Sequence, residues 1–71
     1  MNRFGEKLRT LRKRRGLTVQ QLGDLLGVHN SHVVRLEKGT RKPSVDLVLE
    51  ISRIFNVSSD QLIKDELDLD D

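Results

Sequence analysis

The sequence contains no cysteine, no tryptophan and no tyrosine, and its only aromatic residues are two phenylalanines. Without cysteine, neither a disulfide framework nor a thiolate metal site can stabilise the fold. So few aromatic rings argue against a protein that binds single strands or RNA by stacking bases on them. No apolar run reaches the length of a membrane span or of a signal-peptide core. With 71 residues, we therefore expect one small domain in a reducing compartment.

The net charge of +2 conceals two segments of opposite sign. Residues 1–42 contain 11 Lys and Arg against 3 Asp and Glu, whereas residues 43–71 contain 2 against 8. A basic segment of this density is typical of proteins that bind polyanions, although a merely solvated face has the same composition. The acidic residues at 64–71 are expected to form a frayed C-terminal tail.

Apolar residues recur at helical spacing along most of the chain, and no stretch shows the alternation of a strand. Thr18 and Gln21 form a capping box ahead of one helix, and Gly27 is placed to end that helix. Ser58 and Gln61 form a second capping box. The fold class is therefore all-α, a compact bundle with helices expected at 3–15, 19–26, 29–37, 45–55 and, briefly, around Leu62 and Ile63.

Two of these helices have features that indicate how they pack. Gly23 lies inside the second helix, where glycine costs about 1 kcal/mol relative to alanine, so we expect the following helix to approach closely there. The fourth helix is apolar around most of its circumference and is interrupted only by Asp46, Glu50 and Arg53. A domain of this size is too small to cover such a helix fully, which favours self-association.

Three other classes of protein fit the residues poorly. His29 and His32 have a spacing that two metal ligands can use, but no cysteine or carboxylate cluster completes a shell, so no metal or cofactor is expected. No glycine-rich phosphate loop or nucleophile–base pair is present, so an enzyme is not expected. The basic first helix has a narrow apolar stripe without tryptophan, which favours core packing over a membrane surface.

The segment from Thr18 to Glu37 reads as two short helices joined by a tight turn. The second of them directs Val33 and Leu36 inward, and its other face is polar. From Leu17 onward the sequence is LTxxxLxxxLGVxxSxVxRLExGxRKPS. This pattern resembles the Cro/cI-type helix-turn-helix domain, the lambda-repressor-like or XRE family, and the resemblance covers residues 4–63.

The resemblance implies a five-helix DNA-binding domain over residues 1–63, followed by the acidic tail. It implies that residues 29–37 enter the major groove of double-stranded operator DNA while residues 19–26 cross the backbone. It further implies a cytoplasmic, nucleoid-associated transcriptional repressor or autoregulator that binds a two-fold symmetric operator as a homodimer. The same pattern also fits an antitoxin or adaptor that binds a partner protein through its tail or its fourth helix, and RNA binding ranks third.

Matched position by position, the family pattern assigns roles to individual residues. Asn30, Ser31 and Arg35 fall where family members touch base edges, and His32 is a fourth candidate. Arginine can bond guanine through O6 and N7, and asparagine can bond adenine through N6 and N7, which suits these placements. Arg12 and Glu37 match a structural ion pair. The phosphate contacts are expected at Lys38, Arg41 and Lys42, with Gln20 and His29 as further candidates, and the dimer interface at Leu47, Ile54, Asn56, Val57 and Ile63.

The chain departs from the family pattern at two positions. Val19 stands where the family commonly has a phosphate-contacting glutamine, and only the adjacent Gln20 is available to replace it. His29 stands where the reading helix is usually capped by Ser or Thr. Because an imidazole changes charge between pH 5 and 8, a modest pH dependence of DNA binding is predicted. An operator affinity that His29→Ser leaves unchanged from pH 5.5 to 8 would refute this.

Overall fold

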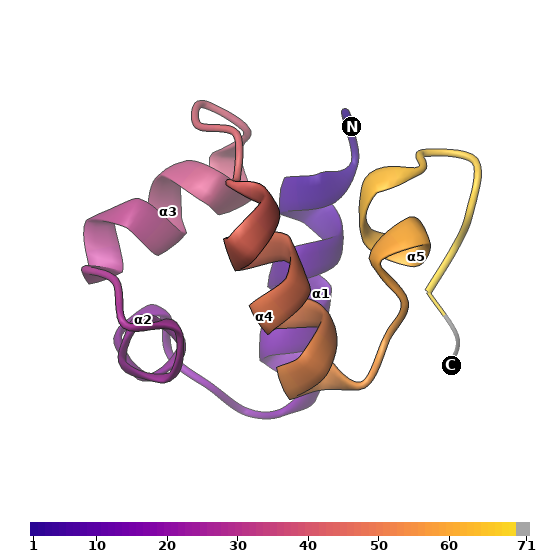
Figure 1. Ribbon diagram of the computed structural model, residues 1–71. Coiled ribbons are helices and arrows are strands. Elements are labelled where there is room, and N and C mark those ends of the chain that lie inside the picture. Colours follow the sequence, from indigo (N-terminus) through magenta and orange to yellow (C-terminus); the bar gives the residue numbers. More distant parts are fainter. Residues whose placement is uncertain (70–71) are drawn as a thin grey trace.

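The computed structural model describes residues 1–69, and in this range it contains helices and no strand. Figure 1 shows α4 crossing in front of α1, with α2 and α3 on one side of this pair and α5 on the other. The predicted all-α class is confirmed for the described residues. The bounds are α1 (Phe4–Arg14), α2 (Val19–Leu26), α3 (Asn30–Lys38), α4 (Val45–Phe55) and α5 (Ser59–Ile63).

Side-chain caps set where the helices begin. The hydroxyl of Thr18 accepts from the backbone N–H of Gln21, and the Gln21 side chain returns a bond to Thr18 N at 2.8 Å. Ser58 caps α5 in the same reciprocal way, as predicted. Gly27 ends α2 with φ at 71°, a left-handed conformation that costs glycine little. The Thr18 cap and Gly27 thus fix the two ends of α2, and the short turn to α3 starts at Gly27.

The core lies where α1, α3 and α4 meet, with one residue each from α2 and α5. Each helix presents apolar residues on one face, as helical periodicity requires. On α4 this face is limited to Val48, Ile51 and Phe55, which are buried. The complete buried apolar cluster is Phe4, Leu8, Leu11, Leu22, Val33, Leu36, Val48, Ile51, Phe55 and Leu62.

Two glycines allow α3 and its preceding turn to pack closely. A Cβ on Gly5 would lie 2.4 Å from the carbonyl oxygen of Glu37, which no real side chain tolerates, so α1 and the end of α3 meet backbone to backbone. A Cβ on Gly23 would lie 2.7 Å from the carbonyl oxygen of Val28. The close approach predicted at Gly23 is thus present, and the turn leading into α3 makes it.

An ion pair also ties α1 to the end of α3. The Nε of Arg12 donates to one carboxylate oxygen of Glu37 at 2.7 Å, and Nη2 donates to the other at 3.1 Å. Nη1 donates to the carbonyl oxygen of Leu17 at 2.9 Å, which holds the entrance to α2. The hydrogen bond to Glu37 raises the pKa of Arg12. The ion pair predicted from the family pattern is therefore present, and it fixes α3 relative to the rest of the bundle.

A buried lysine that the sequence did not reveal holds the segment after α5. Lys7 is 2% exposed, and its ammonium group donates to the carbonyl oxygens of Gln61, Lys64 and Leu67 at 2.5–2.9 Å. Three carbonyl partners satisfy all three donors of an ammonium group, which allows it to be buried. Lys7 therefore anchors the C-terminal segment to α1.

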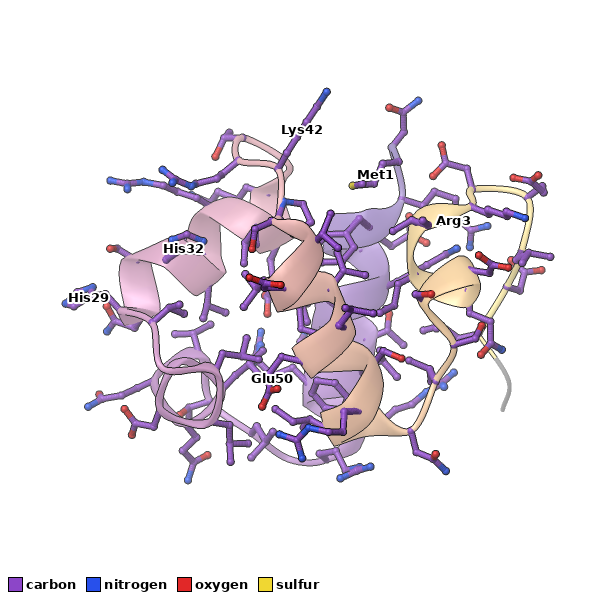
Figure 2. All side chains as sticks on the ribbon, in the orientation of Figure 1. Met1, Arg3, His29, His32, Lys42 and Glu50 are labelled. Carbon is purple, nitrogen blue, oxygen red and sulfur yellow. The ribbon has the colours of Figure 1, made fainter. Side chains whose placement is uncertain are left out.

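The prediction of a frayed tail over residues 64–71 is wrong for residues 64–69. Besides the contacts of Lys7, the carboxylate of Asp65 accepts from the backbone N–H groups of Arg3 and Asn2, both at 2.9 Å. These bonds lower the pKa of the Asp65 carboxyl, so they stabilise the fold above its ordinary pKa and are lost as the pH falls through the lowered value. Arg3 also pairs with Asp68, on the side of the molecule away from α3 (Figure 2). Residues 70–71 lie outside the described residues.

Candidate nucleic-acid interface

The outer face of α3 is polar and exposed. Val33 and Leu36 are fully buried, so the helix cannot rotate about its axis without exposing them. The opposite face then carries Asn30, Ser31 and Arg35, all exposed. These are three of the four residues for which base contacts are predicted, and the structure brings them together on one surface.

His29 caps α3, the role that its position in the family pattern indicates, and the first residue within the helix is Asn30 instead of His29. Its Nδ1 accepts from the backbone N–H of Ser31 at 3.1 Å and lies 2.9 Å from the Ser31 hydroxyl oxygen. The imidazole in its neutral form therefore replaces the hydroxyl of a Ser or Thr cap. Figure 2 shows the ring at the outer end of α3, directed away from the body of the molecule.

His32 lies at the edge of this surface and not at its centre. It is half-buried and lines an open groove of about 610 Å³ between α3 and α4. The other wall of the groove includes the carboxylates of Asp46 and Glu50 from α4. In Figure 2, Glu50 lies on the face of α4 that looks toward α2 and α3. His32 therefore shares this groove with two carboxylates of α4 and with Arg41 and Lys42 of the preceding loop.

Three cations for which phosphate contacts are predicted lie at the C-terminal end of α3 and on the loop that follows it. Lys38 ends α3, and the loop after it is held by bonds from the N–H and hydroxyl of Thr40 to the carbonyl oxygen of Arg35. Arg41 and Lys42 on that loop are exposed, and Figure 2 shows Lys42 extended away from the bundle. Within residues 1–69, no hydrogen bond or ion pair occupies the charged groups of Lys38, Arg41 and Lys42. The loop thus presents cations beside the polar face of α3.

The first turn of α2 contains Gln20, another residue for which a phosphate contact is predicted. Val19 is half-buried and packs against the core, so an apolar residue at this position is explained by packing. Gln20 is exposed at the next position of the same turn. The structure thus leaves the amide of Gln20 accessible on the helix that precedes α3.

The residues predicted to form a dimer interface are less exposed than expected. Four of them are half-buried and pack against the core, and only Asn56, in a left-handed conformation with φ at 54°, is exposed. The most exposed apolar residues of α4 are instead Val45 at 75% and Leu49 at 55%. The half-buried residues are Leu47, Ile54, Val57 and Ile63.

Two further observations concern the alternatives considered above. Among residues 1–69, no three or more side chains of His, Cys, Asp and Glu are grouped so that they could hold a metal ion. In the same range, none of the helices is long and apolar enough to cross a membrane.

α2 and α3 thus form a tight helix–turn–helix pair, and the second helix carries an exposed polar face and has cations at its C-terminal end. A family model described as Helix-turn-helix matches residues 8–62. The chain belongs to the helix-turn-helix family. The resemblance to the Cro/cI type is confirmed, and the family is one of DNA-binding transcription regulators and not a class of enzyme.

This helix-turn-helix chain is similar to proteins named as HTH-type transcriptional regulators. It is 38% identical over 63 residues to the HTH-type transcriptional regulator YqaE of Bacillus subtilis strain 168, covering 89% of this chain and 54% of YqaE. It is 33% identical over 65 residues to ImmR of the same organism, covering 90% of this chain and 51% of ImmR. The chain therefore spans about half the length of these two relatives.

The fold matches that of a repressor solved on DNA. The P22 c2 repressor in complex with a synthetic operator superimposes with a TM-score of 0.81 at 30% identity, over 86% of this chain and 92% of that one. This likeness confirms the five-helix, repressor-like architecture of the helix-turn-helix chain.

Proposed function

We propose that this helix-turn-helix chain binds double-stranded DNA sequence-specifically and thereby regulates transcription, most simply as a repressor or autoregulator. In this proposal α3 enters the major groove and α2 crosses the backbone. The observation that carries it is the exposed polar face of α3, held by the buried Val33 and Leu36, with unpaired cations at its end. The relatives named as transcriptional regulators and the P22 c2 repressor solved with its operator support it.

The roles of the side chains follow from their chemistry. Arg35 can donate two bonds to guanine O6 and N7, and Asn30 can pair its amide with adenine N6 and N7. Ser31 and His32 are the other two candidates for base contacts. Ser31 has a shorter side chain, and His32 lies at the edge of the surface. Phosphate contacts, which position the protein without reading sequence, fall to Gln20, His29, Lys38, Arg41 and Lys42.

The active form in this proposal is a homodimer. Exposed apolar residues Val45 and Leu49 on α4 add to the half-buried residues predicted for the interface, namely Leu47, Ile54, Val57 and Ile63, and to Asn56. A contiguous apolar surface of this kind is typical of a protein–protein interaction site. A dimer with two-fold symmetry would present two copies of α3 about 34 Å apart, one turn of DNA.

An adaptor or antitoxin role that uses the acidic tail is less well supported. The carboxylates of Asp65 and Asp68 are already bound to the N-terminal segment through Arg3 and the backbone N–H groups of residues 2 and 3. A partner that took hold of this tail would have to displace those contacts.

The proposal is tested by comparing Arg35→Ala with Lys42→Ala on a bound duplex and on random DNA. Arg35→Ala should cost about 1–3 kcal/mol of binding free energy on the preferred sequence only, and it should relax the preference at one base pair of each half-site. Lys42→Ala should weaken all sequences alike and flatten the plot of log affinity against log salt by about one unit. Fluorescence anisotropy titrations at several salt concentrations measure both effects.

Arg53→Ala is the matched control, because Arg53 is exposed on α4 and already paired with Glu50. It should leave both sequence preference and salt dependence close to those of the wild type. If Arg35→Ala instead weakened binding to random DNA as much as binding to the preferred sequence, base reading by Arg35 would be excluded.

A further inference from the structure

Two cations on the outer face of α1 have no role in the interface described so far. Arg9 and Lys13 are exposed and lie four residues apart, so their side chains are neighbours on one helix face. Within residues 1–69, neither charged group has a hydrogen-bond or ion-pair partner. Within the same residues, the charged groups of Lys38, Arg41 and Lys42 also have no such partner.

Most other cations of the chain are engaged elsewhere. Arg15 donates to the carbonyl oxygen of Ile54 and lies over the ring of Phe55, and Arg12 pairs with Glu37. Contacts of this kind also engage Arg3, Lys7, Arg53 and Lys64. Arg9 and Lys13 therefore resemble the proposed phosphate-binding residues and differ from the structural ones.

A groove joins these two cations to the end of the reading helix. It has a volume of about 490 Å³ and runs between α1 and the C-terminal end of α3, where Arg9, Lys13 and Lys38 all line it. A smaller groove of about 270 Å³ next to it is lined by Arg9, Lys38 and Val34, the last on the flank of α3. The surface is thus continuous from α1 to α3.

The charge balance of this groove is positive. Its two carboxylates, Glu6 and Glu37, each have a cationic partner outside the groove lining, Arg3 at 3.6 Å and Arg12 at 2.7 Å. The groove on the opposite flank of α3 is lined by two carboxylates, Asp46 and Glu50, and by two cations, Arg41 and Lys42. A polyanion lying along α3 is therefore attracted on the α1 side as well as by Arg41 and Lys42 of the loop.

We propose that Arg9 and Lys13 form a second phosphate-binding site, which receives the DNA backbone beside the base pairs that α3 reads. This inference rests on the proposed function and extends its contact surface from α3 and the following loop onto α1. Arginine offers a planar fork of donors and lysine a point charge, both of which suit phosphate oxygens in any sequence. The site therefore adds affinity and orientation without adding sequence preference.

The test is the double substitution Arg9→Ala and Lys13→Ala, measured as affinity for a bound duplex and for random DNA at several salt concentrations. Each lost phosphate contact flattens the slope of log affinity against log salt by about 0.9, so the expected change is about 1.8. Over a fourfold rise in salt, the wild type should then lose about 12-fold more affinity than the variant. Preferred and random sequences should be weakened by the same factor.

Two control variants isolate the site. The double substitution Arg53→Ala and Lys64→Ala removes the same net charge, but both residues are already paired, Arg53 with Glu50 and Lys64 with Asp60. This variant should keep the wild-type slope of log affinity against log salt. Arg9→Lys with Lys13→Arg keeps both charges in place and should also keep it. Circular dichroism and thermal unfolding check that all variants fold.

The outcomes separate this inference from the proposed function. If the wild type binds DNA and the Arg9/Lys13 alanine variant has the same slope as the Arg53/Lys64 control, the second phosphate site is excluded and the proposed function stands. If the wild type binds no duplex DNA at low salt, both are overturned. A slope reduced by about 1.8 only in the Arg9/Lys13 alanine variant supports the site.

Discussion

Replacing Glu37 by alanine should lower the free energy of unfolding by about 3–5 kcal/mol, because it leaves the Arg12 guanidinium largely buried without its carboxylate. The two side chains are only 13% and 8% exposed, so water can do little to replace the lost bonds. A loss of this size is a large fraction of the 5–15 kcal/mol that stabilises a typical domain. Urea unfolding followed by circular dichroism measures it.

The control for this prediction is Glu50→Ala, which breaks the ion pair between Glu50 and Arg53. The Arg53 side chain is 71% exposed and that of Glu50 is 38% exposed. Exposed pairs of this kind contribute about 0–1 kcal/mol, so the control should remain close to the wild type. If Glu37→Ala cost no more than Glu50→Ala, the pair of Arg12 and Glu37 would not be what fixes α3 against α1.

Replacing Gly5 by alanine should lower the free energy of unfolding by about 1–3 kcal/mol, as overpacking in a close contact does. The new Cβ would lie 2.4 Å from the carbonyl oxygen of Glu37 and 2.5 Å from that of Leu36, and backbone atoms cannot move aside as a flexible side chain can. α1 and α3 would have to separate. Thermal unfolding followed by circular dichroism measures the change.

The sign of this effect is informative, because helix propensity alone predicts the opposite. Alanine is favoured over glycine in a helix by about 1 kcal/mol, so a Gly5→Ala variant more stable than the wild type would contradict the close contact. Glu6→Ala, at the next and exposed position of α1, is the matched control and should change stability little.

The parts of the site that the sequence predicts are those encoded locally. The capping box of Thr18 and Gln21, the left-handed Gly27 and the inward Val33 and Leu36 lie within twenty residues of one another, and each obeys a short-range rule. Together they place the helix pair and decide which face of α3 is polar. The capping role of His29 is predictable for the same reason, since the Nδ1 acceptor acts only two residues along the chain.

The parts that the sequence does not predict depend on contacts between distant residues. A lysine on the first helix reads as a surface residue, and only the folded chain brings three carbonyl groups, 54 to 60 residues away, to Lys7. Gly5 looks like a weak helix start until the backbone of α3 is seen against it. The ordering of residues 64–69 follows from the same long-range bonds, which composition alone does not reveal.

The apolar surface of α4 shows an intermediate case. Its periodicity correctly indicates that the bundle leaves part of the helix uncovered, but it does not show which part. Core packing turns Val48, Ile51 and Phe55 inward and leaves Val45 and Leu49 exposed. Tertiary packing decides which face of a short helix is buried. It therefore also decides which apolar residues stay exposed and can form an interface.

The proposal that the outer face of α3 reads base pairs as part of a symmetric dimer is tested most directly by selecting bound duplexes from a random pool, with the wild type and with Arg35→Ala. The wild type should enrich inverted half-sites whose centres lie about 34 Å apart, and the variant should lose the preference at one base pair of each half-site. A pool that shows no enriched sequence, or an enriched sequence that Arg35→Ala leaves unchanged, would contradict it.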